Sequence, residues 1–121
     1  SLNESNFDEV LKKTKLATVI IKRLQLHKKA EDICQSIIHN TLSLDSKYNI
    51  ASKNNDTTSE IILLSEIYDI LRTDRAYKMG LTHQRAIEVI IESLKPFFNP
   101  SLIERIYKYN KEIKNAYEGA I

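Results

Sequence analysis

The charged side chains between residues 66 and 78 are those whose types and spacing could do chemistry. Glu66 and Asp69 stand inside an otherwise apolar stretch, and Arg75 and Lys78 follow it. An acid on an apolar helix must be paired or reach solvent, and Arg72, three residues after Asp69, could pair with it locally. A guanidinium beside an ammonium binds anions, but cations in the last turn of a helix also complement its dipole. The residues alone leave both interpretations of Arg75 and Lys78 open: an anion site, or a charged helix end.

Cysteine and histidine are scarce in this chain. Cys34 is the single cysteine, so neither an internal disulfide nor a cysteine zinc site can form, and its apolar surroundings indicate a buried thiol in a reducing compartment. His27 and His83 stand at predicted helix boundaries and are expected to be exposed. No glycine precedes Gly80, which excludes Walker-type and dinucleotide-binding loops. We therefore expect a cytoplasmic protein that lacks these phosphate-binding loops.

The composition is that of one globular domain. The 121 residues are 42% hydrophobic and 28% charged, and no apolar run is long enough to span a membrane. Eighteen basic residues against sixteen acidic ones give a net charge of +2, so we expect no nucleic-acid partner. Because the first residue is Ser rather than Met, we expect residues 1–121 to be a piece of a longer protein.

The apolar periodicity predicts an all-α fold, a compact bundle of five to six helices. Thr57 and Glu60 fit a capping box, Thr82 and Asn99 are predicted N-caps, and Gly80 is expected in a left-handed position that ends a helix. A polar stretch, residues 44–58, is expected to be a loop. The predicted helices cover about residues 6–26, 28 to 42 or 44, 57–80, 82–96 and 100–119.

Apolar stripes indicate which sides of these helices should be buried. The helix that starts at Thr57 has apolar residues around much of its circumference and is expected in the middle of the fold. On the first helix the side expected to face the core consists of Val10, Thr14, Ala17, Ile21 and Leu24, widened by Leu11, Leu16 and Ile20. On the second helix it consists of Ile33, Cys34, Ile37, Ile38 and Leu42. These sides together provide more apolar helix surface than one small core needs.

Several stretches share their order and spacing with one known family. They are LLSEIYDILRTDRAYK (63–78), LTHQRA (81–86), FFNPSL (97–102), IIKRLQL (20–26) and IIHN (37–40). These stretches resemble the HD-GYP family, bacterial cyclic di-GMP phosphodiesterases of the HD superfamily. The family's corresponding patterns read roughly A-D-x-Y-D-A-L-T-S-x-R-P-Y-K, F-D-P-x-L-V, I-A-x-x-L-G-L and L-L-H-D. The resemblance is strong in the C-terminal half and weaker in the N-terminal half, and it implies an HD-like fold.

The resemblance also implies a metal site, of which this chain keeps little. The family's HD doublet is matched by His39-Asn40, its first His falls on Glu9, and Glu66 replaces its late Asp ligand. An amide is a weaker ligand than a carboxylate, and the 25 residues between Asn40 and Glu66 hold no His and no Gly, where the family carries further His ligands and its GYP loop. Too few ligands remain for a two-metal site. We expect no cofactor; a single metal, if bound, would be Mn²⁺ or Fe²⁺ held weakly.

The resemblance, together with the positions at which this chain differs from the family pattern, leads to three hypotheses about function. Arg75 and Lys78 match positions that imply contact with cyclic di-GMP phosphates, while Asp69 and Tyr77 are expected to be structural. The favoured hypothesis is a non-catalytic signalling or regulatory module that acts through partner or nucleotide binding, and excess apolar surface favours a protein partner or a homodimer. The alternatives are a metal-dependent phosphohydrolase with a reduced site and a receptor that binds a cyclic dinucleotide without cleaving it.

Overall fold

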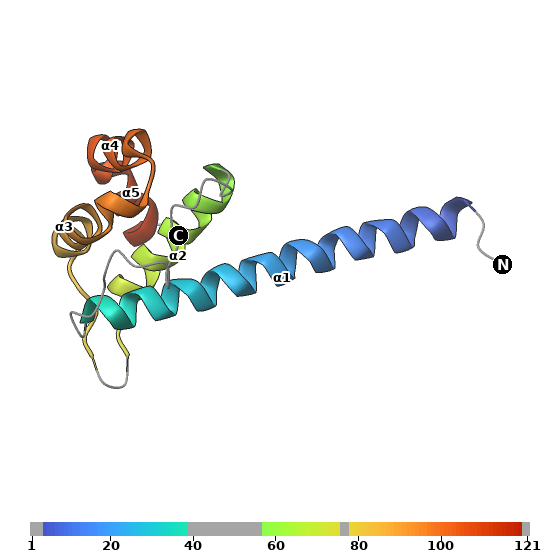
Figure 1. Ribbon diagram of the computed structural model, residues 1–121, viewed down its shortest axis with the longest axis horizontal. Coiled ribbons are helices and arrows are strands. Elements are labelled where there is room, and N and C mark those ends of the chain that lie inside the picture. Colours follow the sequence, from blue (N-terminus) through green and yellow to red (C-terminus); the bar gives the residue numbers. More distant parts are fainter. Residues whose placement is uncertain (1–3, 39–56, 76–77, 120–121) are drawn as a thin grey trace.

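The computed structural model describes residues 4–38, 57–75 and 78–119. Over these residues the chain is helical, with one isolated bridge and no longer strand, which confirms the all-α fold. The elements are α1 (Glu4–Ile38), α2 (Thr57–Arg72), α3 (His83–Leu94), the short 3₁₀ helix η1 (Lys95–Phe97), α4 (Pro100–Lys108) and α5 (Asn110–Glu118). Figure 1 shows α2 to α5 gathered around the C-terminal part of α1. Among these helices none is both long and apolar enough to cross a membrane.

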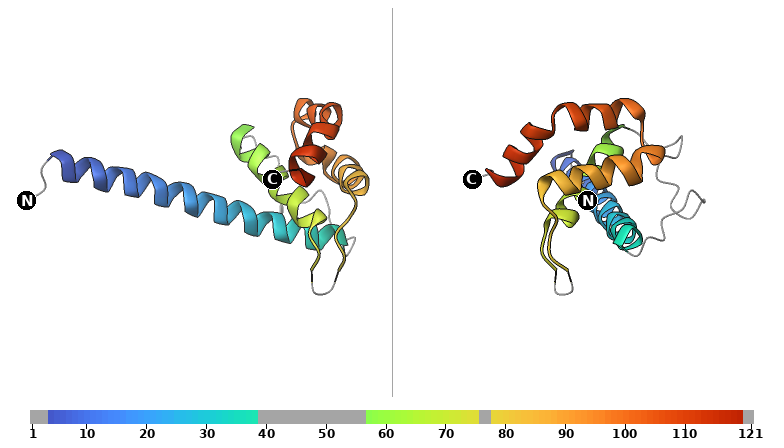
Figure 2. Two further views of the ribbon diagram at one scale, coloured as in Figure 1. Left: turned by 180° about the vertical axis from the view of Figure 1, so that it is seen from behind. Right: turned by 90° about the vertical axis from the view of Figure 1, so that its left-hand side faces the viewer.

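Helix α1 is continuous over 35 residues, about 52 Å. The prediction of two helices meeting near His27 is wrong, because no glycine or proline stands there to interrupt the backbone hydrogen bonds. Only side chains from Leu26 onward join the core, and the earlier part projects away from the other helices (Figures 1 and 2). The predicted compact bundle is therefore limited to the end of α1 and the helices that follow it.

The core lies where α2 packs on the C-terminal part of α1 and α3 covers α2. Eight residues of α2 are buried, which confirms its predicted place in the middle of the fold. The largest fully buried side chains come from three helices and are Ile33, Cys34, Leu63, Ile67, Leu71, Ile90 and Leu94. Of the buried side predicted for the second helix, Ile33 and Cys34 are buried, Ile37 packs against the core, and Ile38 is 40% exposed.

The stripe of α1 that was expected to face the core is exposed. Val10, Ile21 and Leu24 are between 51% and 63% exposed, and Leu11, Leu16 and Ile20 are between 42% and 60% exposed. The periodicity identifies this side correctly as apolar, but α2 reaches α1 only from about Leu26 onward. Within the described ranges nothing covers it.

Helix α2 ends at Arg72, two turns before the predicted stop at Met79-Gly80. The chain then reverses in a narrow hairpin instead of continuing as helix. Arg75 and Lys78 exchange two backbone hydrogen bonds across it, with N···O distances of 2.7 and 3.1 Å. The two cationic residues that were predicted at a helix end therefore lie opposite each other on a hairpin.

Gly80 is needed for close packing rather than as a left-handed helix stop. Its backbone is not in the left-handed region, but a Cβ at this position would collide with the carbonyl group of Arg72 at the end of α2. Its N–H donates to Asp74 Oδ1 at 2.6 Å, and the N–H of Leu81 donates to the Leu71 carbonyl at 2.7 Å. The absent side chain lets the returning strand of the hairpin close the end of α2.

The helix starts predicted at Thr57, Thr82 and Asn99 are confirmed, whereas the one predicted at about residue 28 lies inside α1. Helix α2 begins at Thr57, so the last two residues of the stretch 44–58 are helical, while residues 44–56 lie outside the described residues. Thr82 accepts the backbone N–H three residues later at 3.2 Å, and Asn99 accepts the one two residues later at 3.0 Å. These caps satisfy N–H groups that the first turns of α3 and α4 leave unpaired.

The last predicted helix is divided at Tyr109 into α4 and α5. The Asn110 side chain donates to the Tyr107 carbonyl at 2.6 Å, and the Tyr109 N–H donates to the Arg105 carbonyl at 2.9 Å. An asparagine side chain that takes a backbone carbonyl competes with helix continuation. The interruption turns α5 back toward α2 (Figure 2).

Candidate functional site

Glu66, predicted as a metal ligand, is engaged by side chains of α1. His27 Nδ1 lies 2.9 Å from Glu66 Oε2, and Arg23 Nη2 lies 3.9 Å from Oε1. His27 Nε2 lies 3.4 Å from Glu31, whose carboxylate is also 2.9 Å from Arg75 Nη2. The result is a chain of polar contacts that links α1, α2 and the hairpin. His27 lies inside α1 rather than at a helix boundary, and it is half-exposed as expected.

The structure does not bring Glu9 to Glu66. Glu9 lies on the projecting part of α1 and pairs at 3.4 Å with the lysine four residues later. His27, which contacts Glu66, is 18 residues further along the same helix, a separation of about 27 Å. His39 and Asn40 lie outside the described residues. Over the part of the chain that is described, no group of three or more His, Cys, Asp and Glu side chains is arranged to hold a metal ion.

Arg75 and Lys78 lie opposite each other on the hairpin. Like charges at opposed positions of an antiparallel pair repel, and Glu31 offsets this by its contact with Arg75. A hollow of about 10 Å³, enough for about one water, lies beside Arg75, Lys78, Cys34 and Ile70. Arg75 Nε is buried there with no hydrogen-bond partner among the described residues. An anionic ligand of Arg75 would compete with the Glu31 carboxylate.

Asp69 does not pair with Arg72, although the sequence allows it. Asp69 is exposed on α2, and its backbone carbonyl accepts both the N–H and the hydroxyl of Thr73, at 3.0 and 2.7 Å. It therefore reaches solvent, the other outcome open to an acid on an apolar helix. Tyr77 lies outside the described residues.

Arg72 forms a junction that sequence reasoning missed. It donates to the Tyr68 hydroxyl at 2.5 Å, to the Leu81 carbonyl at 3.1 Å and to Glu118 at 2.7 Å. Its guanidinium carbon lies 5.5 Å from the ring centroid of Tyr68 and 4.8 Å from that of Tyr117, so it packs on both rings, which also contact each other edge to face. The hydrogen bond from Arg72 lowers the pKa of the Glu118 carboxyl below its usual 4.5. One side chain thus joins α2, the hairpin and α5.

His83, expected to be exposed, is only 9% exposed and continues this network. Because Asn110 Nδ2 donates to the Tyr107 carbonyl, Asn110 Oδ1 faces His83 Nε2 at 3.3 Å, and Nε2 therefore carries the proton. With Nε2 as the donor, Nδ1 accepts from the Tyr68 hydroxyl at 2.8 Å. Burial raises the pKa of the Tyr68 phenol, which keeps this donor protonated.

The network connects three helices, α2, α3 and α5, and holds no free nucleophile. It runs from Glu118 and Arg72 through Tyr68 and His83 to Asn110. The spacing of Tyr68 and Arg72, one helical turn apart, was the only sequence signal for it. The remaining members come from α3 and α5, and their approach depends on the hairpin and on the division at Tyr109. A hollow of about 790 Å³, lined by both polar and apolar side chains, lies beside His83.

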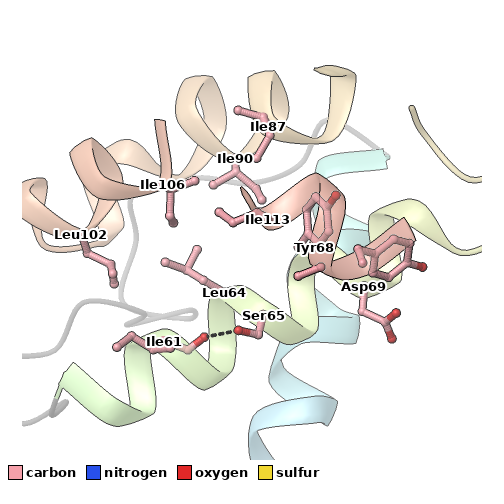
Figure 3. A pocket seen from close by; sticks show the side chains of 12 residues that line it. Ile61, Leu64, Ser65, Tyr68, Asp69, Ile87, Ile90, Leu102, Ile106 and Ile113 are labelled. Atoms are coloured by element: carbon pink, nitrogen blue, oxygen red, sulfur yellow. Dashed lines mark hydrogen bonds between the residues drawn. The ribbon is translucent and has the colours of Figure 1, made fainter. Parts of the chain in front are cut away.

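An apolar groove of about 470 Å³ is enclosed by α2, α3, α4 and α5. Figure 3 shows its lining side chains converging from these helices. Its labelled apolar members are Ile61 and Leu64 from α2, Ile87 and Ile90 from α3, Leu102 and Ile106 from α4, and Ile113 from α5. The Ser65 hydroxyl in its wall donates to the Ile61 carbonyl at 2.8 Å. The groove suits an apolar group and offers little polar chemistry to act on one.

Cys34 is predicted to be unreactive in the folded protein. It is 1% exposed, its Sγ lies 3.8 Å from the Ile67 carbonyl, and burial raises the pKa of its thiol from 9.0 to about 12. At about pH 8 such a thiol is ionised about a thousandfold less than usual. Alkylation followed by mass spectrometry should be slow in buffer and fast in urea. Equal rates in both solvents would mean that the α1–α2 contact opens readily.

The described residues define an all-α domain with a projecting N-terminal helix, an ion-pair chain at the α1–α2 contact and an apolar groove between the later helices. Comparison with known protein families, with curated proteins and with solved structures finds no match to this chain.

Proposed function

We propose that this chain is a shortened, degenerate relative of the HD-GYP proteins and acts in the cytoplasm as a non-catalytic regulatory module that binds a protein partner. The observation that supports this proposal most strongly is the set of contacts made by the Glu66 carboxylate. Its carboxylate is engaged by His27 and Arg23, and Glu9 lies about 27 Å from this contact. A carboxylate that already contacts a histidine and an arginine is poorly placed to hold a catalytic metal.

A protein partner is favoured over a nucleotide for two reasons. Glu31 already neutralises Arg75, so a phosphate would have to displace a carboxylate 2.9 Å away. In addition, eight large apolar side chains of α1 between Phe7 and Leu24 are more than 40% exposed. Apolar residues gathered on one element mark interaction surfaces, whereas scattered ones do not.

The proposal is tested by metal content and hydrolysis. Protein incubated anaerobically with Mn²⁺ or Fe²⁺ is expected to retain no stoichiometric metal and to leave cyclic di-GMP and its linear product intact. Elemental analysis and chromatography of the nucleotides measure the two outcomes. Metal-dependent hydrolysis that disappears in a His39→Ala variant would overturn the proposal and establish a phosphohydrolase with a reduced metal site.

A calorimetric titration with cyclic di-GMP separates a module that binds proteins from a nucleotide receptor. We expect no saturable binding. Binding that is lost in the Arg75→Ala, Lys78→Ala double variant would assign a receptor function instead. The matched control is Arg105→Ala, Lys108→Ala, which removes an arginine and a lysine at the same spacing from the exposed surface of α4.

A further inference from the structure

We propose that the hollow beside His83 binds a small aromatic phosphate monoester, a planar ring that carries one doubly charged phosphate group. The hollow lies between α3 and α5, and the last turn of α4 adds Tyr107 to its lining. Its volume of about 790 Å³ is within the range of about 300–1,000 Å³ that is typical of small-molecule sites. The inference goes beyond the proposed function, because neither Glu66 nor Arg75 borders this hollow.

The acidic side chains that line the hollow are already paired with arginines. Glu118 Oε1 lies 2.7 Å from Arg72 Nη2, and Glu88 Oε2 lies 3.2 Å from Arg85 Nη1. Each carboxylate therefore has a guanidinium beside it that offsets its negative charge. An anion in the hollow meets no uncompensated carboxylate from these two residues.

Two lysines on α5 supply positive charge that is not offset in this way. Lys111 and Lys114 are one turn apart, exposed, and part of the lining. Neither forms an ion pair with another described residue. The pKa of Glu118 is lowered mainly by the hydrogen bond from Arg72, and the charge of Lys114 adds to this effect without an ion-pair contact. A phosphate monoester carries a charge of about −1.5 to −2 at pH 7, which matches the two lysines.

Apolar side chains of the same hollow suit a planar ring. Ile87 and Ile91, one turn apart on α3, belong to its lining. Tyr107 is 67% exposed, so its ring is available for stacking on an aromatic ligand. The isoleucines and the tyrosine select for a ring, and the lysines select for an anion. Together they favour a ligand that has both parts.

His83 adds a polar group whose orientation is fixed before a ligand arrives. Its side chain is buried, and Nδ1 is held at 2.8 Å by the Tyr68 hydroxyl. Its Nε2 makes a long contact of 3.3 Å with Asn110 Oδ1. A phosphate oxygen is a stronger acceptor than an amide oxygen and can compete for this donor. Because the ring is already ordered, binding costs no further side-chain entropy at His83.

The first test is an NMR titration of the ¹⁵N-labelled full chain with 1-naphthyl phosphate. We expect saturable shifts of the backbone amides of α3 and α5, with a dissociation constant of about 0.1–1 mM, the range for a ligand of this size. 1-Naphthol lacks the phosphate and inorganic phosphate lacks the ring. Each should bind at least about tenfold more weakly than 1-naphthyl phosphate.

Variants of exposed residues test the two parts of the site separately. The Lys111→Gln, Lys114→Gln double variant should weaken the binding of 1-naphthyl phosphate at least about tenfold. Its matched control is Lys12→Gln, Lys15→Gln, which removes two exposed lysines at the same spacing from α1 and should keep the wild-type affinity. Tyr107→Ala should weaken the binding of 1-naphthyl phosphate but not that of inorganic phosphate. Circular dichroism verifies that all variants remain folded.

Three results would each overturn the inference: no saturable shifts, full affinity in the Lys111→Gln, Lys114→Gln variant, or binding of 1-naphthol as tight as that of its phosphate. Shifts centred on the apolar groove would also overturn it, because they would place the ring elsewhere. The Arg75→Ala, Lys78→Ala variant should bind 1-naphthyl phosphate like the wild type. The ligand site and the non-catalytic function therefore succeed or fail separately.

Discussion

Replacing Arg72 with alanine is expected to lower the free energy of unfolding by about 2–4 kcal/mol, the largest effect of any single polar side chain described here. The change removes three hydrogen bonds in a site where Arg72 is 11% exposed. The Leu81 carbonyl loses its side-chain donor, and the Tyr68 hydroxyl loses the bond from Arg72 and keeps only its contact with His83. It also removes the guanidinium that packs on the rings of Tyr68 and Tyr117. Urea unfolding followed by circular dichroism measures the loss.

The matched control is Arg85→Ala. Arg85 contacts Glu88 at 3.2 Å and Glu92 at 3.8 Å, but its side chain is 54% exposed, and removing it should change stability by no more than about 0.5 kcal/mol. Arg72→Lys should fall between the two, because an ammonium keeps the charge but not the planar set of donors. Equal losses for Arg72→Ala and Arg85→Ala would show that the junction between the helices does not form.

The stability that the contact between Arg72 and Glu118 contributes depends on pH, and it decreases in acid. The folded-state pKa of Glu118 lies below its usual 4.5, because Arg72 donates a hydrogen bond to the carboxylate. The stability that this pair contributes is therefore complete above about pH 4.5 and is lost as the pH falls through the lower folded-state pKa. The stability difference between the wild type and a Glu118→Gln variant should narrow in acid and be constant near neutral pH.

Substituting Gly80 by alanine is expected to cost about 1–3 kcal/mol. The added Cβ meets the backbone carbonyl of Arg72, which cannot rotate away as a side chain would, so either the hairpin or the end of α2 must move. The hydrogen bonds from Gly80 to Asp74 and from Leu81 to Leu71 should weaken together. Thermal and urea unfolding measure the cost.

Gly119→Ala provides the comparison for Gly80→Ala. A Cβ at Gly119 meets one close atom, the Asn115 carbonyl oxygen at 2.8 Å, at the end of α5, a helix with no buried residues. That end can adjust without disturbing the core, so the loss should be smaller. A loss at Gly119 as large as that at Gly80 would contradict the assigned role of the hairpin.

The fold class and the helix starts could be predicted because their causes are local. Thr57, Thr82 and Asn99 mark helix starts through short-range chemistry, and the apolar pattern of α2 is sufficient to place it centrally. The helix ends could not be predicted in the same way. Arg72 is followed by no helix breaker, and α2 stops there because the N–H of Leu81 on the returning chain takes up the Leu71 carbonyl while Gly80 packs against the carbonyl of Arg72.

The candidate site was predicted less well, because its geometry depends on distant contacts. Glu66 was identified as a residue that needs a partner, but its partner His27 is 39 positions away in the sequence. The expected meeting of Glu66 with Glu9 required α1 to be broken near His27, and no local signal decides between a break and a continuous helix there. The buried state of His83 likewise depends on Asn110 and Tyr68, which only the tertiary structure brings to it.

The two halves of α1 differ in what keeps them helical. From Ala30 to Cys34 the backbone hydrogen bonds are protected by the core, so their amide hydrogens can exchange with solvent only when the domain itself opens. From Phe7 to Leu24 no core protects the backbone hydrogen bonds, which depend on helix propensity alone. A helical segment of this length is marginally stable in water. One continuous helix therefore contains a boundary of local stability near Leu26, and its N-terminal half orders and frays independently of the fold that it extends from.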